Sequence, residues 1–218
     1  MLEAKNIGYW YTHKDDYLFK DVNLTFEAGQ SYAIVGQSGS GKTTFLSLLA
    51  GLDQPKAGQI LYEGQDIKKI GMTNYRKRDV SVVFQSYNLF TYMSPLDNLL
   101  TAMAITGSQH AGDKEFAATM LKKLGITEDL MRKNVQHLSG GQQQRVAIAR
   151  TMACDAQLVV ADEPTGNLDE NNTVEVVGLF QKIAHEQGKC VIIVTHESAV
   201  AEMCDTTYRL EKKVFSQV

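Results

Sequence analysis

The sequence has few of the features that mark secreted, membrane-spanning or nucleic-acid-binding proteins. Its three cysteines, Cys154, Cys190 and Cys204, form no C-x-x-C pair, which favours free buried thiols in a reducing compartment over disulfides or a zinc site. No apolar run approaches the ~18 to 20 residues of a membrane-spanning helix, and the N-terminus has no signal-peptide core. A net charge of -3 provides no basic field for nucleic acid. We therefore expect a cytoplasmic protein that binds no nucleic acid and reaches a membrane only through a partner.

Short apolar runs alternate with helical stretches along the 218 residues. The runs at 32–35, 80–84, 158–161 and 191–194 are continuous, which indicates strands buried on both faces of a mainly parallel sheet. Helices are predicted near 42–50, 115–124, 140–153 and 173–187. Residues 1–30 alternate loosely between apolar and polar, as half-buried antiparallel strands do. The predicted fold class is α/β.

Residues 36–44, G-Q-S-G-S-G-K-T-T, match the phosphate-binding pattern G-x-x-x-x-G-K-[ST]. Glycines let backbone N–H groups approach phosphate oxygens, and the following helix N-terminus adds partial positive charge. A glycine-rich turn without a ligand is the alternative, but the flanking strand and helix favour a phosphate site. Lys42 is predicted to reach the β- and γ-phosphates, and the Thr43 hydroxyl to bind Mg²⁺. The candidate ATP-binding residues of this loop are Gly36, Ser38, Gly39, Ser40, Gly41, Lys42, Thr43 and Thr44.

The apolar run at 158–161 ends in two adjacent carboxylates, Asp162 and Glu163. Successive strand side chains point to opposite faces, so the two can have different roles. Asp162 is predicted to hold Mg²⁺, directly or through water, and Glu163 to polarise the water that attacks the γ-phosphate. An acidic strand end is weak evidence alone, but together with the phosphate loop it predicts ATP hydrolysis.

Residues 138–145, L-S-G-G-Q-Q-Q-R, open a predicted helix. Ser139 and Gln142 have capping-box spacing, while Gly140 and Gly141 leave the helix N-terminus bare for an anion. An ordinary capped helix start is the alternative. The segment resembles the LSGGQ signature of ABC ATPases, a family that combines it with a phosphate loop and an Asp-Glu strand. The resemblance implies that Ser139, Gly140, Gly141 and Gln142 contact the γ-phosphate of ATP held by the opposite subunit of a dimer.

The resemblance extends from Tyr11 to His196 and implies roles for further residues. Gln85 matches the glutamine that senses Mg²⁺ and the attacking water, so it joins Thr43 and Asp162 as a candidate Mg²⁺ ligand. His196 matches the switch histidine that contacts the γ-phosphate. The implied catalytic residues are therefore Lys42, Gln85, Glu163 and His196.

Two further matches concern the dimer interface and the adenine base. Residues 167–169 match the D-loop that crosses the interface, with Asp169 near the nucleotide and Asn167 in place of the usual small residue. Tyr11 is the best match to the aromatic residue that stacks on adenine. Tyr9 and Trp10 remain alternatives, because stacking requires only an aromatic face.

The resemblance implies a P-loop NTPase (RecA-like) core with an N-terminal antiparallel β subdomain and an α-helical signature subdomain. We expect a single ABC ATPase domain over residues 1–218. Its core and β subdomain occupy 1–86 and 146–218, and its helical subdomain occupies 87–145. Such a subunit binds Mg-ATP, dimerises with itself or with a related ATPase, and drives a separate permease from the cytoplasmic face of the membrane.

The motifs T-G-N-L-D at 165–169 and V-F-Q-S-Y-N-L at 83–89 are most similar to one branch of the family. That branch contains lipoprotein-release, macrolide-exporter, bacitracin-resistance and cell-division ATPases, which implies export or force transmission. Residues 86–95 are rich in aromatic side chains. We expect a groove for a permease helix lined by Tyr87, Phe90, Tyr92 and Met93, whereas Leu89 fits the core of the helical subdomain equally well.

Two other functions are weighed against a transport ATPase. A permease-independent ABC ATPase of DNA repair or translation carries coiled coils, zinc motifs or a second ATPase unit, and the sequence has no heptad tract, cysteine pair or second unit. A non-enzymatic nucleotide-binding module is disfavoured because Lys42, Asp162, Glu163 and His196 are all present. Neither the transported substrate nor the choice between homodimer and heterodimer is predicted.

Overall fold

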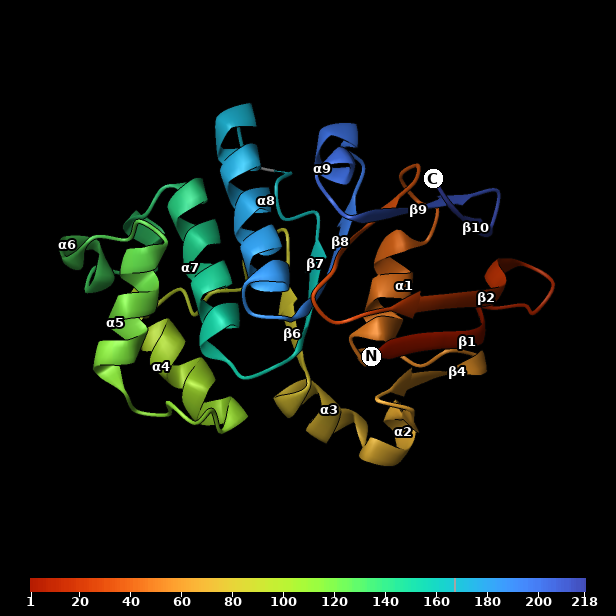
Figure 1. The fold of residues 1–218 in the computed structure, drawn as a ribbon, viewed down its shortest axis with the longest axis horizontal. Coiled ribbons are helices and arrows are strands. Elements are labelled where there is room, and N and C mark those ends of the chain that lie inside the picture. The colour runs from red at the N-terminus through yellow and green to blue at the C-terminus, as the bar shows by residue number, and fades with distance from the viewer. Residues whose placement is uncertain (167) are drawn as a thin grey trace.

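The computed structural model describes residues 1–166 and 168–218, without the side chains of residues 170 and 171. Two sheets and the helices around them make up this part of the chain (Figure 1). The larger sheet has the strand order β10-β9-β3-β8-β7-β6, and the smaller has the order β2-β1-β4-β5. The predicted α/β class is confirmed.

The larger sheet is parallel except at one edge. Strands β3 (Ser31–Val35), β6 (Val80–Val83), β7 (Leu158–Asp162), β8 (Cys190–Thr195) and β9 (Thr206–Glu211) run in the same direction. Strand β10 (Val214–Gln217) pairs antiparallel with β9. The four continuous apolar runs of the sequence are β3, β6, β7 and β8, so the prediction of a mainly parallel sheet is confirmed.

Strand β7 shows how this sheet separates two hydrophobic cores. Leu158 and Val160 belong to the core that contains helix α1 (Lys42–Leu49), whereas Val159 and Ala161 belong to the core that contains α7 (Gly140–Ala153) and α8 (Glu170–His185). Neighbouring side chains of a strand point to opposite faces, so α1 and α7 lie on opposite sides of the sheet. Figure 1 shows this separation, with β6, β7 and β8 between the two helices.

The smaller sheet packs on the α1 side. It consists of β1 (Leu2–Trp10), β2 (Tyr17–Phe26), β4 (Ala57–Tyr62) and β5 (Gln65–Asp66), all paired antiparallel. The antiparallel strands predicted for residues 1–30 are β1 and β2. Their buried side chains join Phe45 and Leu46 of α1 in one core, so α1 lies between the two sheets (Figure 1).

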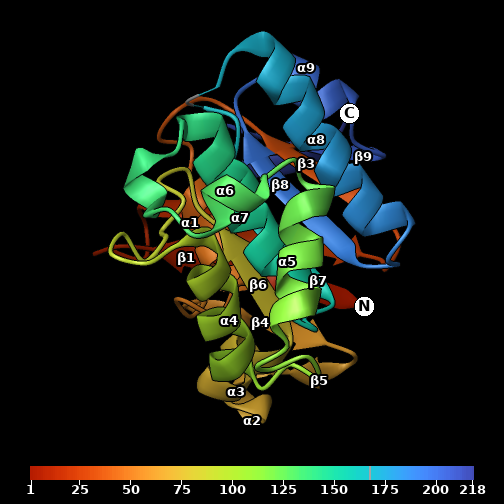
Figure 2. The same cartoon turned by 90° about the vertical axis from the view of Figure 1, so that its left-hand side faces the viewer.

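The α7 side of the larger sheet carries the remaining long helices. Helices α4 (Pro95–Thr106), α5 (Lys114–Lys123) and α6 (Glu128–Met131) gather around α7 (Figure 2), and the short helix η1 (Val135–His137) leads into it. The short helices α2 (Ile67–Ile70), α3 (Met72–Arg78) and α9 (Ser198–Glu202), together with β4, β5, β9 and β10, were not predicted from the sequence. No helix in the described residues is long and apolar enough to cross a membrane.

Candidate functional site

The loop between β3 and α1 has the backbone geometry that a phosphate-binding turn requires. Gly39 and Gly41 have φ values of 77° and 108°, which favour glycine. A side chain at Gly36 would place its Cβ 2.5 Å from the carbonyl oxygen of Leu210 in β9. The Ser40 hydroxyl is buried and has no hydrogen-bond partner among the described residues. The loop therefore contains a polar group that a bound phosphate could satisfy.

Lys42, the first residue of α1, directs its charge into this loop. Its Nζ donates hydrogen bonds to the carbonyl oxygens of Gly36, at 2.8 Å, and of Gln37, at 3.1 Å. The residue is only 5% exposed. These carbonyls hold the ammonium group inside the curve of the loop, where negatively charged phosphate oxygens would be stronger partners.

Thr43 and Asp162 bring two oxygen atoms together at the mouth of the loop. The Thr43 hydroxyl donates to Oδ1 of Asp162 at 3.1 Å. Burial raises the pKa of the Asp162 carboxyl above its ordinary value, and the Thr43 hydrogen bond opposes part of this rise. A hydroxyl and a carboxylate are ligands that Mg²⁺ prefers, so this pair fits the predicted metal. A cation here would favour the ionised carboxylate.

Glu163 and His196 meet at the carboxyl ends of β7 and β8. Glu163 Oε1 lies 3.2 Å from His196 Nδ1, and the Glu163 backbone N–H donates to the Val194 carbonyl at 2.9 Å. Glu163 has a φ of 44°, in the left-handed region that residues other than glycine seldom adopt. This turn separates the Glu163 carboxylate from Asp162, as the predicted division of roles requires.

Gln85 approaches the same place from the end of β6. A Cβ placed on Gly166 would lie 2.9 Å from Nε2 of Gln85, so the amide sits beside the turn that follows Glu163. The structure thus brings together Lys42, Thr43, Gln85, Asp162, Glu163 and His196.

Of the three aromatic candidates for adenine, Tyr11 is the most accessible. Tyr11 is 68% exposed, and its hydroxyl lies 2.8 Å from Thr44 Oγ1. Tyr9 is buried, and its hydroxyl donates to Asp53 at 2.6 Å. This hydrogen bond is the main cause that raises the Tyr9 pKa to about 12. Trp10 is partly exposed. The ring of Tyr9 is therefore not available for stacking, whereas Tyr11 is beside the phosphate loop.

The predicted capping box at the start of α7 is confirmed. The Gln142 backbone N–H donates to Ser139 Oγ at 3.3 Å, and the Ser139 N–H donates to Gln142 Oε1 at 2.9 Å. Ser139 and Gly140 are exposed, and Gly141 is partly exposed. The first residues of α7 are therefore accessible from outside the chain, as an anion site requires.

The predicted D-loop lies next to this helix start. Asp169 caps α8 by accepting a hydrogen bond from the Asn172 N–H at 3.0 Å, and Asn172 Oδ1 would lie 3.3 Å from a Cβ on Gly141. Asn167 lies outside the described residues. Among the described residues, Ser139 and Gln142 form their side-chain hydrogen bonds with each other and not with the phosphate loop, and α1 and α7 lie on opposite faces of the sheet. Asp169 lies at the start of α8, on the α7 side.

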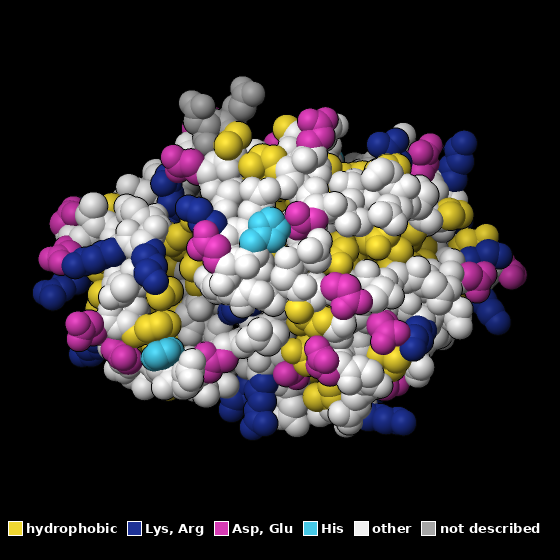
Figure 3. All heavy atoms as spheres, viewed as in Figure 1, with side chains coloured by type: hydrophobic (Ala, Val, Ile, Leu, Met, Phe, Trp, Pro, Cys, Tyr) yellow, Lys and Arg dark blue, Asp and Glu magenta, His cyan; other side chains and the backbone are white. Residues whose placement is uncertain are grey.

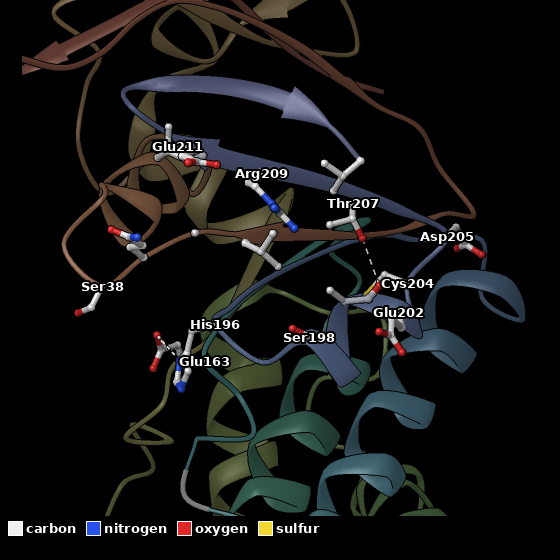
Figure 4. Close-up of a pocket in the computed structure, with 16 residues that line it drawn as sticks. Ser38, Glu163, His196, Ser198, Glu202, Cys204, Asp205, Thr207, Arg209 and Glu211 are labelled. Carbon is white, nitrogen blue, oxygen red and sulfur yellow. Dashed lines mark hydrogen bonds and ion pairs between the residues drawn. The ribbon is translucent and has the colours of Figure 1, made fainter.

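A cavity of about 1020 Å³ opens beside the Glu163–His196 pair. Ser38, Glu163 and His196 lie at one side, and residues of α9 and β9, among them Glu202, Arg209 and Glu211, form the rest (Figure 4). Lys42, Thr43 and Thr44 do not line it. Acidic and basic side chains are interspersed across the face shown in Figure 3. Of the predicted phosphate-binding residues, Gly36 and Ser38 therefore line this cavity.

Several neighbours of these residues were missed in the sequence. Leu210 covers Gly36 with its backbone, Glu197 accepts a hydrogen bond from Thr165 at 2.6 Å, and Arg145 joins α7 to Asn172 at 3.0 Å. Arg145 lies within the signature-like segment, and this position could have indicated that it contributes to the site. Backbone contacts such as that of Leu210 leave no signal in the residue types.

Comparison with known proteins places these features in a family. Residues 19–166 match the family model described as ABC transporter. The ABC transporter ATP-binding protein YclH of Bacillus subtilis, itself uncharacterised, is 53% identical over 216 residues, which cover 99% of this chain and 96% of YclH. The lipoprotein-releasing system ATP-binding protein LolD of Idiomarina loihiensis is 36% identical, with 93% and 90% of the two chains covered.

Solved structures agree with the sequence relatives. A dimeric structure of the ABC transporter cassette MJ0796 has a TM-score of 0.88 and 30% identity, and the match covers 100% of this chain and 98% of that chain. A second dimeric structure of MJ0796, in a post-hydrolysis state with ADP and Pi, has a TM-score of 0.87 at the same identity and coverage. The predicted family, its lipoprotein-release branch and the predicted RecA-like fold with its antiparallel β subdomain are confirmed.

Proposed function

This chain belongs to the ABC transporter family, as one of its ATP-binding ATPases, and from that premise we propose that two such subunits enclose Mg-ATP and drive a membrane permease. The observation that carries the proposal is the separation of the two halves of the site. The phosphate loop precedes α1 on one face of the larger sheet, and the signature-like loop precedes α7 on the other. One chain alone therefore supplies only half of the residues around each nucleotide.

In the proposed site, this chain's residues divide into binding and chemical roles. Lys42 exchanges the carbonyls of Gly36 and Gln37 for the β- and γ-phosphates, and Tyr11 stacks on adenine. Thr43 and Asp162 would hold Mg²⁺, with Gln85 as a further ligand, and the ion would supply positive charge beside the phosphates.

Glu163 is the proposed general base. Its carboxylate accepts a proton from the attacking water as the bond to the γ-phosphorus forms and the bond to the β-phosphate oxygen breaks, which yields ADP and phosphate. The proposed role of His196, whose Nδ1 lies 3.2 Å from Glu163 Oε1, is to orient the carboxylate and to contact the γ-phosphate. Ser139, Gly140, Gly141 and Gln142 of the second subunit present backbone N–H groups and the Ser139 hydroxyl to the same phosphate. Asp169 lies at the interface between the subunits.

A mixing experiment tests whether the site is composite. Both variants are made in a Glu163→Gln background, which slows hydrolysis. Lys42→Ala should prevent ATP binding. Ser139→Arg should leave ATP binding intact but prevent the signature-like loop from docking on the γ-phosphate of the ATP that the partner subunit holds. Neither protein should dimerise alone with ATP and Mg²⁺. Mixed together under different tags, they should form a heterodimer, because one site then combines the intact phosphate loop of one chain with the intact signature-like loop of the other.

The control is each variant mixed with a differently tagged copy of itself, which should give no capture. If the mixture of the two variants also gives no ATP-dependent capture while the Glu163→Gln parent dimerises, the composite site is refuted. A Ser139→Arg protein that dimerises as well as its parent would refute the role of the signature-like loop directly.

The proposed permease site lies on the α3–α4 side of the molecule. Two hollows of about 260 and 540 Å³ share Leu52 and Arg76, and together they form a groove from residues 51–56 to Phe84, Ala102 and Arg150. In Figure 1, α3 and α4 lie on either side of the lower end of β6. Leu52 and Ile105 are 47% and 58% exposed on this side. A groove lined by both apolar and polar side chains, beside exposed apolar residues, fits a short amphipathic helix of a permease.

The aromatic residues that the sequence indicated for this role are placed differently. Tyr92 is exposed, Tyr87 and Leu89 pack against the α7 core, and neither Phe90 nor Met93 lines the two hollows. We keep Tyr92 as a proposed rim residue and propose that Leu52 and Ala102, which line the groove, contact the permease helix. In this arrangement residues 87–145 act as a helical subdomain within one ABC ATPase domain, and docking holds the subunit at the cytoplasmic face of the membrane.

Co-purification with the permease subunit of the proposed transporter, produced together with this chain, tests the groove. Leu52→Asp and Ala102→Asp should abolish co-purification and leave the basal ATPase rate of the isolated subunit unchanged. Val174→Asp is the matched control, because Val174 is 54% exposed on α8, away from the groove. Normal capture by both groove variants would place the docking surface elsewhere.

A further inference from the structure

Gln85 leads into a turn with an unfavourable backbone. Tyr87 and Asn88 have φ values of 61° and 46°, so two successive residues other than glycine occupy the left-handed region. Within the turn, the Tyr87 N–H donates to the Phe84 carbonyl at 2.9 Å, and the Ser86 hydroxyl donates to Asn88 Oδ1 at 2.9 Å. Local bonds of this kind seldom hold such a conformation alone, so groups outside the turn must support it.

Arg150 supplies that support from helix α7. Its Nη1 donates to the Asn88 carbonyl at 2.7 Å, and its Nη2 donates to the Tyr87 carbonyl at 3.1 Å. Within the described residues, no carboxylate forms an ion pair with this half-buried guanidinium, so its directed bonds go to the turn. The planar fork of arginine holds both carbonyls in one geometry, which a single donor cannot do.

The same helix begins with the signature-like loop. Arg150 lies ten residues after Gly140, and the Tyr87 hydroxyl would lie 3.2 Å from a Cβ on Gly140. The backbone of the turn after Gln85 is therefore hydrogen-bonded to Arg150 of α7, and the Tyr87 hydroxyl lies close to the first turn of the same helix. A shift of Gln85 that moves the turn would therefore pull on α7 through the two Arg150 hydrogen bonds.

We propose that Arg150 is a positioning residue that couples Gln85 to the signature-like loop. When Gln85 moves toward a bound γ-phosphate, the Arg150 fork carries α7 along, and Ser139 to Gln142 shift toward the nucleotide of the second subunit. Arg150 itself contacts no nucleotide. The inference rests on the proposed roles of Gln85 and of residues 139–142 in a composite site.

The test separates nucleotide binding from dimerisation. In the Glu163→Gln background, Arg150→Met keeps the alkyl stem and removes the fork, and Arg150→Lys keeps a charged donor. Trp10 is the only tryptophan of the chain and precedes Tyr11, so its fluorescence reports nucleotide binding to the monomer. Gel filtration over a range of ATP concentrations reports dimerisation. Arg150→Met should need about tenfold more ATP for half-maximal dimer formation, the usual size of such a coupling, with nucleotide affinity unchanged. Arg150→Lys should recover part of the loss.

Asn98→Ala is the control for general loosening of the same segment. Asn98 is fully buried on α4 and bonds the backbone N–H and carbonyl of Phe90, so its loss should lower the melting temperature. It has no link to α7 through these bonds, and the ATP dependence of dimerisation should stay that of the parent.

Three results would overturn the inference: dimerisation of Arg150→Met at the parent's ATP concentration, an equal shift in Asn98→Ala, or a loss of nucleotide affinity as large as the loss of dimerisation. A parent protein that never dimerises would overturn the composite site itself, which is a different and separately visible failure.

Discussion

Replacement of Glu163 by glutamine gives the sharpest test of the chemical step. The amide has the shape of the carboxylate, and its oxygen can still accept a hydrogen bond from His196 Nδ1 over the same 3.2 Å. The left-handed backbone at this position, with φ of 44°, places no new demand on glutamine. Binding of Mg-ATP should therefore survive, whereas proton transfer from water should not.

The expected loss follows from what a general base contributes. Positioned bases accelerate reactions by about 10² to 10⁴-fold, which corresponds to about 3 to 5 kcal/mol of transition-state stabilisation. Asp162 cannot take over, because its Oδ1 already accepts a hydrogen bond from Thr43 and belongs to the proposed metal site. We expect kcat to fall by at least about 100-fold, with the dissociation constant for ATP unchanged.

Phosphate release under saturating ATP measures kcat, and gel filtration with Mg-ATP should show a persistent dimer. Glu197→Gln is the matched control. Glu197 lies one residue after His196, and its carboxylate accepts a hydrogen bond from Thr165 rather than serving as the base, so the turnover of this variant should stay near that of the unmodified protein. Turnover of Glu163→Gln within about threefold of the unmodified protein, well short of the loss expected for a missing base, would remove Glu163 from the catalytic role.

Three further changes probe the loop and its surroundings. Tyr11→Ala should weaken ATP binding by about 1 kcal/mol, whereas Tyr11→Phe should retain most of the affinity, as titration calorimetry would show. Gly36→Ala should weaken ATP binding more strongly than it lowers the melting temperature, because its Cβ would lie 2.5 Å from the Leu210 carbonyl and displace the loop. Tyr9→Phe should lower the free energy of unfolding by about 1 kcal/mol at neutral pH in urea titrations. The Tyr9 hydrogen bond lowers the Asp53 pKa, so this difference should be complete above the ordinary value of 3.8 and shrink as the pH falls through the lowered pKa.

The residues of the candidate site could be predicted because their types and spacing are tied to chemistry. The phosphate loop needs glycine at Gly39 and Gly41, a lysine and a hydroxyl at fixed offsets, and the capping box needs Ser139 and Gln142. The parallel strands were predictable because burial on both faces leaves continuous apolar runs such as that of β8.

What the sequence could not give depends on long-range contacts. Tyr9 and Tyr11 are two residues apart, and strand alternation would place them on one face, yet Tyr9 is buried and Tyr11 is exposed. The reason is that β1 ends at Trp10 and its pairing with β2 is irregular there. The hydrogen bonds of Arg150 to the carbonyls of Tyr87 and Asn88 could not be predicted either, because every residue has a backbone carbonyl and the residue types do not show which ones an arginine will contact.

The placement of α1 and α7 on opposite faces of the sheet has a genetic consequence for the proposed dimer. A chain that cannot hydrolyse ATP still offers an intact signature-like loop, so it can capture a normal partner rather than remain idle. In a cell that makes both forms, and in which chains pair at random, the fraction of dimers with two normal chains equals the square of the fraction of normal chains. Inactive variants such as Glu163→Gln should therefore be dominant over the normal allele, whereas variants that cannot pair should be recessive.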